Sequence, residues 1–535
     1  MTFNLNSNAS KQGSQNRNRK QVYLPLSLTQ KPLQEKGKGT TFFTPNTQAQ
    51  WIELTSWITD RISDGSITVG GADGNGIISA LPIGTVSIAT QGALEITGNT
   101  GAATVTGGGT RFAWIPAKAA LRAGDVSGAQ WDNASVGTGS TALGRNNTAA
   151  GDFSFAIGSG STASNINSFA GGENSTASGD YAIAWGQNNN ATALHAIALG
   201  FECTASGAYS MAAGWTNTTS GDYGLTLGGY SNTNSSYGAI VMGSENNVAS
   251  GSRSAVVLGE DHDVSGTSEY ATIGGGLSNN IQNSLYAVIS GGYDIDLTSS
   301  STYGTVSGGY SHTMSNSIAG TISGGYDHDM TSSNYATIGG GSANSIDTNS
   351  HYSTIAGGVA CSISGATHSF IGGGDNNDIR SGANYSAIIG GQGGEADRPY
   401  QTTLSAYATT SVKNQSIVLQ GRVTTSDTTP TLVNFGTGVT NIPVSSNTIL
   451  GGTINIVASG GQTAHYMRKF LVRNVGGTTS LVGTVTSVGT DHESDPAMDV
   501  SVTANDTNDS LEVTVTGTNT TTYWSVTVYA TESRD

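Results

Sequence analysis

The feature that most constrains the fold is a five-residue phrase, small-x-[Ala/Thr/Val/Ile]-x-Gly, which recurs seventeen times between residues 140 and 391. Successive final glycines, from Gly144 and Gly158 to Gly373 and Gly391, show a 14-residue repeat at first and mainly 16- and 17-residue repeats later. Each copy alternates with period two and is followed by a second short segment between Gly, Asn and Ser turns. A unit this short suits one coil of a parallel β-solenoid, in which neighbouring strands stack ~4.8 Å apart.

Two columns of the repeat enlarge as the coils lengthen. The centre of the phrase is occupied in order by Ala142, Ala156, Ala170, Ala184, Ala198, Ala212, Thr226, Val241, Val257, Ile273, Ile289, Val306, Ile322, Ile338, Ile355, Ile371 and Ile389. The second segment contributes Ala149, Ala163, Ala177, Ala191 and Ala205, then Val248, Val264, Ile281, Leu297, Met314, Met330, Ile346, Ile363 and Ile379. A wider coil lined by alanine would contain a void, so we expect both columns to point inward.

The positions between these columns bear on oligomeric state. In the early coils they are also apolar, as in the pairs Phe155 and Ile157, and Ile183 and Trp185. A strand that is apolar on both faces must be covered twice, and a thin coil covers one face itself, so we expect another chain on the second face. In later coils these positions are more polar, for example Thr305 and Ser307.

The short coils resemble the repeats of YadA-like trimeric adhesin heads. The phrase Asp180-Tyr181-Ala182-Ile183-Ala184-Trp185-Gly186, followed by Asn189-Asn190-Ala191, carries the resemblance, which extends through repetition over about 250 of the 535 residues. The resemblance implies a left-handed parallel β-roll and a parallel homotrimer. The 16- and 17-residue coils depart from the compact form of the repeat.

The whole chain is expected to be all-β, with a trimeric parallel β-solenoid shaft, a C-terminal antiparallel β-sandwich-like domain and a short N-terminal attachment segment. We assign 1–66 to a basic arm with a short helix at 51–58 and 67–136 to a β-rich connector and cap. The β-roll takes 137–395 and the sandwich 396–535. The sandwich is predicted from longer alternating strands, such as those around 416–419, 470–473, 511–515 and 524–528.

Charge and composition exclude several classes of partner. The chain has a formal charge of −16, and residues 1–40 carry seven basic side chains and one acid, so the rest of the chain is strongly acidic and does not predict nucleic-acid binding. No apolar run is long enough to predict membrane insertion, and the N-terminus lacks the apolar stretch of a signal peptide. Cys203 and Cys361 have no CxxC spacing, which indicates no metal or disulfide framework.

Candidate chemical groups have simpler structural interpretations. The triplets Asp261-His262-Asp263 and Asp327-His328-Asp329 could be metal ligands or acid–base groups, but their histidines fall in a column whose usual occupant is a turn-making Asn. That column holds Asn147, Asn189, Cys203, Asn217, Asn232, Asn246, Asn279, His312, Asn344, Cys361 and Asn377. Tyr523 and Trp524 could bind carbohydrate, although an aromatic in a terminal strand is more often core. We therefore assign no catalytic, cofactor or metal residue and no receptor-binding residue.

Two functions fit such a chain, a bacterial trimeric surface adhesin and a phage tail fibre. Residues 463–470 and 513–517 resemble terminal domains of phage fibre proteins, which favours the fibre. The fibre interpretation implies a structural homotrimer of the virion tail that is assembled in the host cytoplasm. It also implies that the protein is not an enzyme. Its N-terminal region would bind a phage baseplate or tail protein, and its C-terminal domain a host surface glycan or protein. An enzymatic tailspike is the alternative from another class.

Overall fold

The computed structural model describes residues 22–23, 34–35, 106–408, 413–436 and 438–534. The predicted helix at 51–58 lies outside the described residues, as do most of the basic arm and residues 67–105 of the predicted connector. Strands β1 (Val22–Tyr23) and β2 (Gln34–Glu35) form a short antiparallel pair.

A hairpin closes the first coil of the shaft. Strands β3 (Gly109–Ile115) and β4 (Ala120–Val126) pair antiparallel around the 3-10 turn η1 (Pro116–Lys118), and β4 then pairs in parallel with the first coil. Two further turns, η2 (Ala129–Trp131) and η3 (Asn133–Ser135), follow. Arg122 is fully buried at this end and donates to the Ser140 and Ala149 carbonyls, and burial lowers its pKa to about 10. The hairpin therefore covers the first coil of the shaft.

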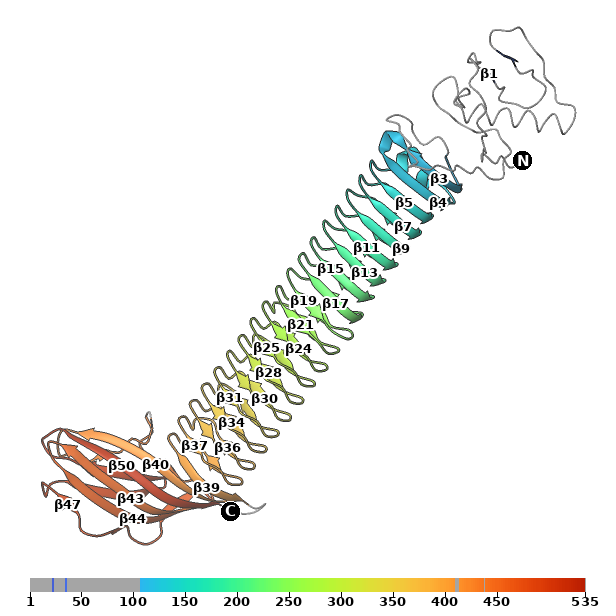
Figure 1. The fold of residues 1–535 in the computed structure, drawn as a ribbon. Coiled ribbons are helices and arrows are strands. Elements are labelled where there is room, and N and C mark those ends of the chain that lie inside the picture. The colour runs from blue at the N-terminus through green and yellow to red at the C-terminus, as the bar shows by residue number, and fades with distance from the viewer. Residues whose placement is uncertain (1–21, 24–33, 36–105, 409–412, 437, 535) are drawn as a thin grey trace, which may run out of the picture. The chain divides into compact units, whose positions relative to one another are not determined.

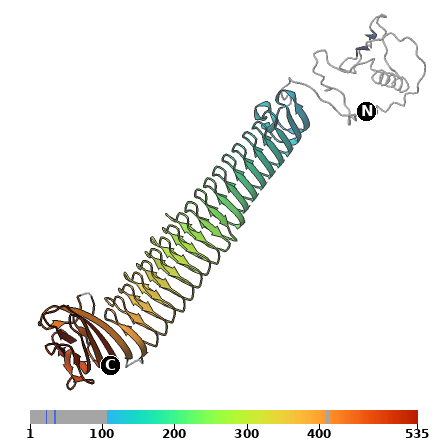
Figure 2. The same ribbon diagram turned by 60° about the vertical axis from the view of Figure 1, so that its left-hand side comes forward.

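Two parallel sheets run along the shaft, and each coil contributes one strand to each sheet (Figures 1 and 2). The first sheet contains β5 (Thr141–Arg145), β7 (Phe155–Ser159), β9 (Phe169–Glu173), β11 (Ile183–Gln187), β13 (Ile197–Phe201), β15 (Met211–Trp215), β17 (Leu225–Tyr230), β19 (Ile240–Met242), β21 (Ala255–Val257), β23 (Thr272–Ile273), β25 (Val288–Ile289), β27 (Thr305–Val306), β29 (Thr321–Ile322), β31 (Thr337–Ile338), β33 (Thr354–Ile355), β35 (Phe370–Ile371), β37 (Ala387–Ile388) and β39 (Thr402–Ala408).

The second sheet contains β6 (Thr148–Ala149), β8 (Thr162–Ala163), β10 (Thr176–Ala177), β12 (Asn190–Ala191), β14 (Thr204–Ala205), β16 (Thr218–Thr219), β18 (Thr233–Asn234), β20 (Val248–Ala249), β22 (Asp263–Ser265), β24 (Asn280–Gln282), β26 (Asp296–Thr298), β28 (Thr313–Ser315), β30 (Asp329–Thr331), β32 (Ser345–Asp347), β34 (Ser362–Ser364), β36 (Asp378–Ile379) and β38 (Glu395–Ala396). From Tyr230 onward a third line of single bridges joins successive coils, so the longer coils have an additional side. The predicted parallel β-solenoid is confirmed.

The two predicted inward columns form the interior of the shaft. The 14-residue coils have an alanine core and the longer coils a core of Ile, Val, Leu and Met, and these side chains are completely buried. Between the two cores the interior is polar, because Thr219 donates to Thr226 over 2.7 Å and Asn234 donates to the Ala239 carbonyl over 2.6 Å.

Three predicted members of the columns are wrong by one residue. Val256 and Ile388 are buried where Val257 and Ile389 were expected, and Ala249 is buried where Val248 was expected. In each coil the strand register is set by the previous coil, which pairs Val241 with Val256, Ile371 with Ile388 and Asn234 with Ala249. An extra residue, before the glycine in the first two coils and after Gly243 in the third, displaces the glycine-based count.

A close backbone approach explains the repeated glycine. At Gly144, φ is +110°, and a Cβ would lie 2.2 Å from the Gly158 carbonyl oxygen of the next coil. Any side chain there would both strain the backbone and push two coils apart. In the 14-residue coils the glycine that ends each phrase is therefore needed for stacking at the strand spacing. In most longer coils the glycine that follows it, such as Gly276 or Gly341, makes this approach instead.

The C-terminal part is a two-layered antiparallel structure, as expected. One sheet contains β40 (Lys413–Thr425), β50 (Thr522–Arg534), β43 (Thr448–Gly460) and β44 (Ala464–Val475), with β45 (Thr478–Leu481), β46 (Thr486–Ser487) and β47 (His492–Glu493) pairing with β44. The other contains β41 (Thr431–Leu432), β42 (Ile442–Pro443), β48 (Asp499–Asn505) and β49 (Ser510–Thr516). Their facing sides enclose one apolar core that includes Ile454, Phe470, Val513 and Val526.

Candidate functional site

The outward face of the first sheet is apolar in the 14-residue coils. Phe155 stacks on Phe169, and Phe169 on Trp185, with ring centroids 5.2 and 5.5 Å apart. Trp185 is 46% exposed and Ile183 is 36% exposed, although both belong to strands whose other face already packs in the core. A row of large apolar side chains in solvent is typical of a protein interaction surface.

The same face is polar in most of the longer coils. The parallel register places Thr305, Thr321 and Thr337 where the early coils have Ile183 or Ile197. Threonine and serine on a strand face tolerate water. The candidate interaction surface is therefore concentrated in coils β7 to β19, where the interior is smallest.

The histidines of the two acidic triplets point into the coil interior, together with the asparagine column. His262, His312 and His328 are buried, and so are Asn189, Asn217 and their equivalents. The predicted member Asn246 is wrong by one residue, because Asn247 is the buried one. The column is thus an interior ladder, and these histidines are enclosed within their own chain.

Hydrogen bonds explain why Asn recurs in this column. The Asn189 side chain donates to the Trp185 and Gly200 carbonyls over 2.8 and 2.6 Å, and its Oδ1 accepts the Cys203 N–H. One amide therefore both donates to the next coil and accepts from it, which satisfies buried backbone groups. Histidine reproduces half of this pattern, since Nδ1 of His328 accepts the Asn344 N–H over 3.1 Å.

Burial shifts the pKa values of the histidines and cysteines in this column and lowers their reactivity. Burial and the neighbouring His328 lower the pKa of His312 to about 4, and burial lowers the pKa values of His262 and His328. Burial raises the pKa of both cysteine thiols, which disfavours the reactive thiolate. Within the part of the chain that the structure describes, no group of three His, Cys, Asp or Glu side chains is arranged to hold a metal ion.

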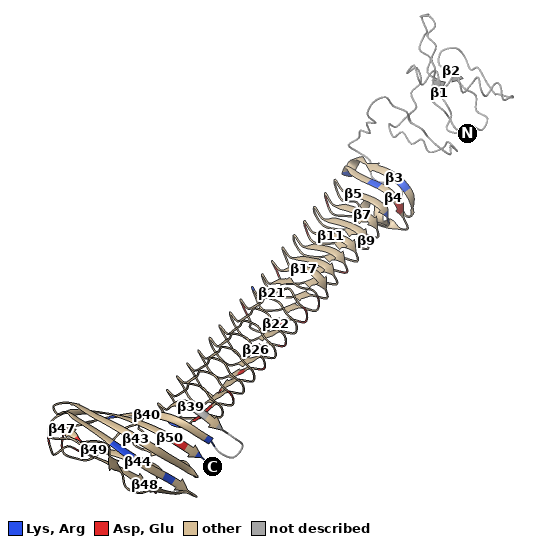
Figure 3. Ribbon diagram, turned by 60° about the horizontal axis from the view of Figure 1, so that its bottom comes forward, with Lys and Arg blue, Asp and Glu red and all other residues tan. Residues whose placement is uncertain are grey.

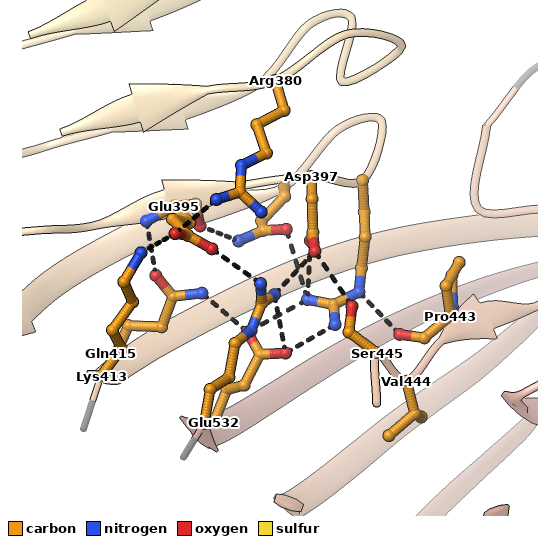
Figure 4. Close-up of polar contacts among 12 residues, drawn as sticks. Arg380, Glu395, Asp397, Lys413, Gln415, Pro443, Val444, Ser445 and Glu532 are labelled. Carbon is orange, nitrogen blue, oxygen red and sulfur yellow. Dashed lines mark hydrogen bonds and ion pairs between the residues drawn. The ribbon is translucent and has the colours of Figure 1, made fainter. Parts of the chain in front are cut away.

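A network of charges joins the last coil to the C-terminal domain (Figure 4). Arg398 forms a two-point ion pair with Glu532, with N–O distances of 2.6 and 3.2 Å, and both side chains are buried. Arg534 binds Glu395 over 2.8 Å and Asp397 over 2.7 Å. Two-point arginine–carboxylate pairs have a defined geometry. The network therefore orients the end of β50 against the last coil.

The network keeps the Glu532 carboxylate ionised. Burial alone would raise the pKa of Glu532, but the positive charges of Arg398 and Arg534 and the hydrogen bonds from Arg398 and Gln415 lower it to about 2. A carboxylate surrounded in this way cannot serve as a proton donor near neutral pH. The cluster is therefore a structural joint and not an acid–base site.

The two candidate aromatics of the C-terminal domain lie on opposite faces of β50. Trp524 is in the core and donates its indole N–H to Thr425 over 2.9 Å, so carbohydrate binding by Trp524 is not supported. Tyr523 is 56% exposed and shares the outer face of the sheet with Tyr529. Figure 3 shows scattered charged residues on the ribbon of this domain.

Sequence comparison links the short coils to a known family. The YadA head domain repeat matches residues 135–161, 163–189, 177–202 and 205–231. These coils are YadA-like head repeats. The YadA match ends close to the point where the coils lengthen and the interior changes from alanine to larger side chains. A search of curated protein sequences finds no match to the chain.

Two solved structures share limited similarity with the chain. One is a tailspike protein, gp49, of Acinetobacter baumannii bacteriophage Fri1, described as a capsular polysaccharide depolymerase, with 9% identity and a TM-score of 0.19 over 76% of this chain and 79% of that one. The other is the tailspike of Acinetobacter phage vB_ApiP_P1, with 10% identity and a TM-score of 0.16 over 77% and 80%. Similarity this low supports no functional argument.

No helix among the described residues is long and apolar enough to cross a membrane. Sequence reasoning missed the charged joint, because Arg398 and Glu532 are 134 residues apart. The only local signal for it was the charged segment 395–398 in a chain with few charges.

Proposed function

We propose that this chain is a structural protein of a phage virion, a homotrimeric tail fibre that contacts the host through its C-terminal domain. The observation that carries the proposal is the apolar outward face of the YadA-like coils, with Trp185 at its centre. Another chain is required to cover that face. Identical parallel chains would place their apolar faces against one another with equivalent coils side by side. The YadA match supports the same assembly.

Different segments of the chain would carry out different parts of the tail-fibre function. We assign attachment to a phage baseplate or tail protein to 1–66, a connector and cap to 67–136, the shaft to 137–395 and the tip to 396–535. Three tips on one fibre would bind a host surface glycan or protein with avidity, even where each contact is weak. Assembly in the host cytoplasm and a place in the virion tail belong to this proposal.

We further propose that the chain is not an enzyme. The acidic side chains that meet at the joint around Glu532 are occupied by arginine and lysine partners. A depolymerase would need free carboxylates beside an open groove. Measured release of reducing sugar from host surface polysaccharide by the purified chain would contradict this part.

A bacterial surface adhesin is the second candidate, since the YadA-like coils themselves favour it. The two functions predict different locations, on the virion for the fibre and on the bacterial surface for the adhesin. In an infected culture, gold-labelled antibody against residues 400–535 should decorate the distal ends of fibres on purified virions. Label on the surface of uninfected cells that carry the gene, with none on virions, would overturn the fibre assignment.

The oligomeric state tests whether other chains cover the apolar outward face of the YadA-like coils. Light scattering of the purified chain should give three times the mass of 54.3 kDa. Seventeen stacked coils at ~4.8 Å each predict a shaft of about 80 Å in negative-stain images. A monodisperse monomer at micromolar concentration would remove the basis for the proposal.

A further inference from the structure

The C-terminal domain has a cationic sheet face in an otherwise acidic protein. The four long strands β40, β50, β43 and β44 pair side by side, and their inward side chains form the apolar core (Figure 1). Alternate residues of a strand point to opposite sides, so the outward side chains are the even-numbered residues of β40 and the odd-numbered residues of the other three strands. They include Arg422, Lys469 and Arg473 and no Asp or Glu. We call this surface the cationic face.

The lack of acidic residues on this face is selective. From residue 396 to residue 535 the chain has eleven Asp and Glu against seven Lys and Arg. The outer face of the second sheet has the opposite charge, because its strands β48 and β49 place Asp499 and Glu512 outward and no Lys or Arg. The two outer sides of the domain therefore differ in sign, and a polyanion is attracted to the cationic face and repelled by the other.

The three cations are available to a ligand. Each is exposed, and within the part of the chain that the structure describes none has an ion pair or a side-chain hydrogen bond. The acids along the neighbouring edge are bound by residues of the inward side. Asp491 accepts two bonds from Arg468 over 2.5 and 2.9 Å, and Glu493 accepts the Tyr466 hydroxyl over 2.6 Å. These acids therefore leave the cationic face unneutralised.

The layout of the face suits an extended ligand. Lys469 and Arg473 are four residues apart on β44, which is about 14 Å at ~3.4 Å per residue. Arg422 lies on β40, three strand spacings or about 14 Å across the sheet. Between these strands, β50 presents Tyr523 and Tyr529, which are 56% and 51% exposed. Charges this far apart cannot meet on one small anion, whereas a chain of charged sugar rings can reach all of them.

The surface between the cations is chemically suited to sugars. A tyrosine such as Tyr529 offers an apolar ring and a hydroxyl, which match the CH groups and the hydroxyls of a sugar ring. The neighbouring pair Thr527 and Asn455 adds a hydroxyl and an amide. A second copy of the domain suits the face less well, because a symmetric contact between identical cationic faces would bring like charges together.

We propose that the cationic face binds an acidic polysaccharide of the host surface, in which Arg422, Lys469 and Arg473 pair with the carboxylates of uronic acid residues. Arg468 shows such a pairing in the same sheet, since its two bonds to Asp491 form a two-point arginine–carboxylate contact. The inference rests on the proposed function, because it names the class of host glycan that the C-terminal domain would bind.

The test measures binding of a galacturonic acid oligomer to the full-length protein by isothermal titration calorimetry. The salt concentration is about 50 mM, where exposed charges are weakly screened. We expect Arg422→Gln with Lys469→Gln and Arg473→Gln to weaken binding at least tenfold. Raising the salt to about 500 mM should weaken binding to the unmodified protein by a similar factor. Binding that is insensitive to salt, or that survives the triple substitution, would overturn the proposal.

A charge-matched control separates the face from the net charge of the protein. Lys11→Gln with Arg17→Gln and Lys20→Gln removes the same charge from the basic arm. This variant should bind the oligomer within twofold of the unmodified protein. Equal weakening by the two triple variants would contradict the assignment to the cationic face.

Other occupants of the face are tested in the same experiment. Dextran represents a neutral polysaccharide, and polyphosphate and a single-stranded oligonucleotide represent phosphate polymers. Tighter binding of any of these than of the galacturonic acid oligomer would reject the uronic acid assignment. The triple variant of the face should sediment like the unmodified protein. A change in its oligomeric state would place the face between chains and overturn the proposal.

Failure of this inference can be distinguished from failure of the fibre assignment. No binding of the oligomer by a protein whose antibody decorates virion fibres would reject the polysaccharide site alone. Binding that depends on the cationic face, in a protein absent from virions, would support the site and reject the fibre.

Discussion

The two halves of the shaft share one backbone plan but distribute their apolar side chains differently. In the 14-residue coils the interior is alanine and the outward sheet face is apolar, whereas in the 16- and 17-residue coils the interior is Ile, Val and Met and the outward face is largely Thr and Ser. Burial of apolar area drives folding in both cases. The proposed partner chain would therefore matter most to the short coils, because the long coils bury larger apolar side chains in their own interior.

The largest effect should follow from placing charges on the outward face of the short coils. Ile183→Asp with Ile197→Asp puts two adjacent carboxylates into the proposed contact between chains, where burying them is costly. We expect the assembly to dissociate at concentrations at least tenfold above those of the unmodified chain, measured by sedimentation velocity.

The matched control is Thr305→Asp with Thr321→Asp, which changes equivalent and adjacent strand positions in the long coils. This pair should leave the oligomeric state unchanged. Equal dissociation by both pairs would show that the two halves do not differ in their dependence on a partner.

Removing a large side chain from the long coils should be the next largest effect. Ile322→Ala leaves a cavity in a fully buried column and should lower the free energy of unfolding by about 2–5 kcal/mol per chain. Chemical denaturation measures the change. A loss below about 1 kcal/mol would mean that the long coils can collapse around the missing side chain.

The reverse change tests the short coils. Ala184→Ile inserts three carbon atoms into a fully buried alanine column and should cost about 1–3 kcal/mol through overpacking. Thermal unfolding monitored by circular dichroism should show a lower Tm. A neutral result would indicate that the short coils have unused interior space and that the comparison of core volumes is wrong.

The smallest effect is a pH dependence confined to the long coils. The pKa of His312 is lowered to about 4, and that of His328 is also lowered, while a histidine in the unfolded chain titrates near ~6.5. The unfolded state therefore takes up protons first as the pH falls. Stability should decrease from about pH 6.5 toward pH 4 and be unaffected by these groups above pH 6.5.

His312→Asn with His328→Asn should reduce this dependence to the part that His262 contributes, because Asn is the usual residue of the column. The joint at Glu532, whose pKa is about 2, loses its charge only at lower pH and serves as an internal reference. An unchanged profile between pH 6.5 and pH 4 in the double variant would assign the dependence to other groups.

Most of the shaft could be predicted from sequence, because its determinants are local and repeated. Period-two alternation and recurring glycines mark the strands, and the simultaneous growth of two columns marks the interior. The exceptions have a specific cause. At Val256 and Val257 both neighbours are equally apolar, so the local pattern cannot distinguish them, and pairing with Val241 decides which points inward.

The candidate site was less accessible to sequence reasoning. The apolar face of the short coils followed from alternation alone, at Ile183 and Trp185. The histidine triplets were interpreted as structural and as part of a turn, whereas the structure places the histidines in a buried hydrogen-bonded ladder. A column position has the same spacing whether it faces solvent or the interior, so spacing alone could not decide.

The sequence by itself determined that the chain stacks coils, where the coils widen and which faces are apolar, because each of these depends on residues one repeat apart. Only the tertiary structure decided the joint between Arg398 and Glu532. The joint depends on charges 134 residues apart in the chain. It is set by distances in space between residues that no local pattern connects.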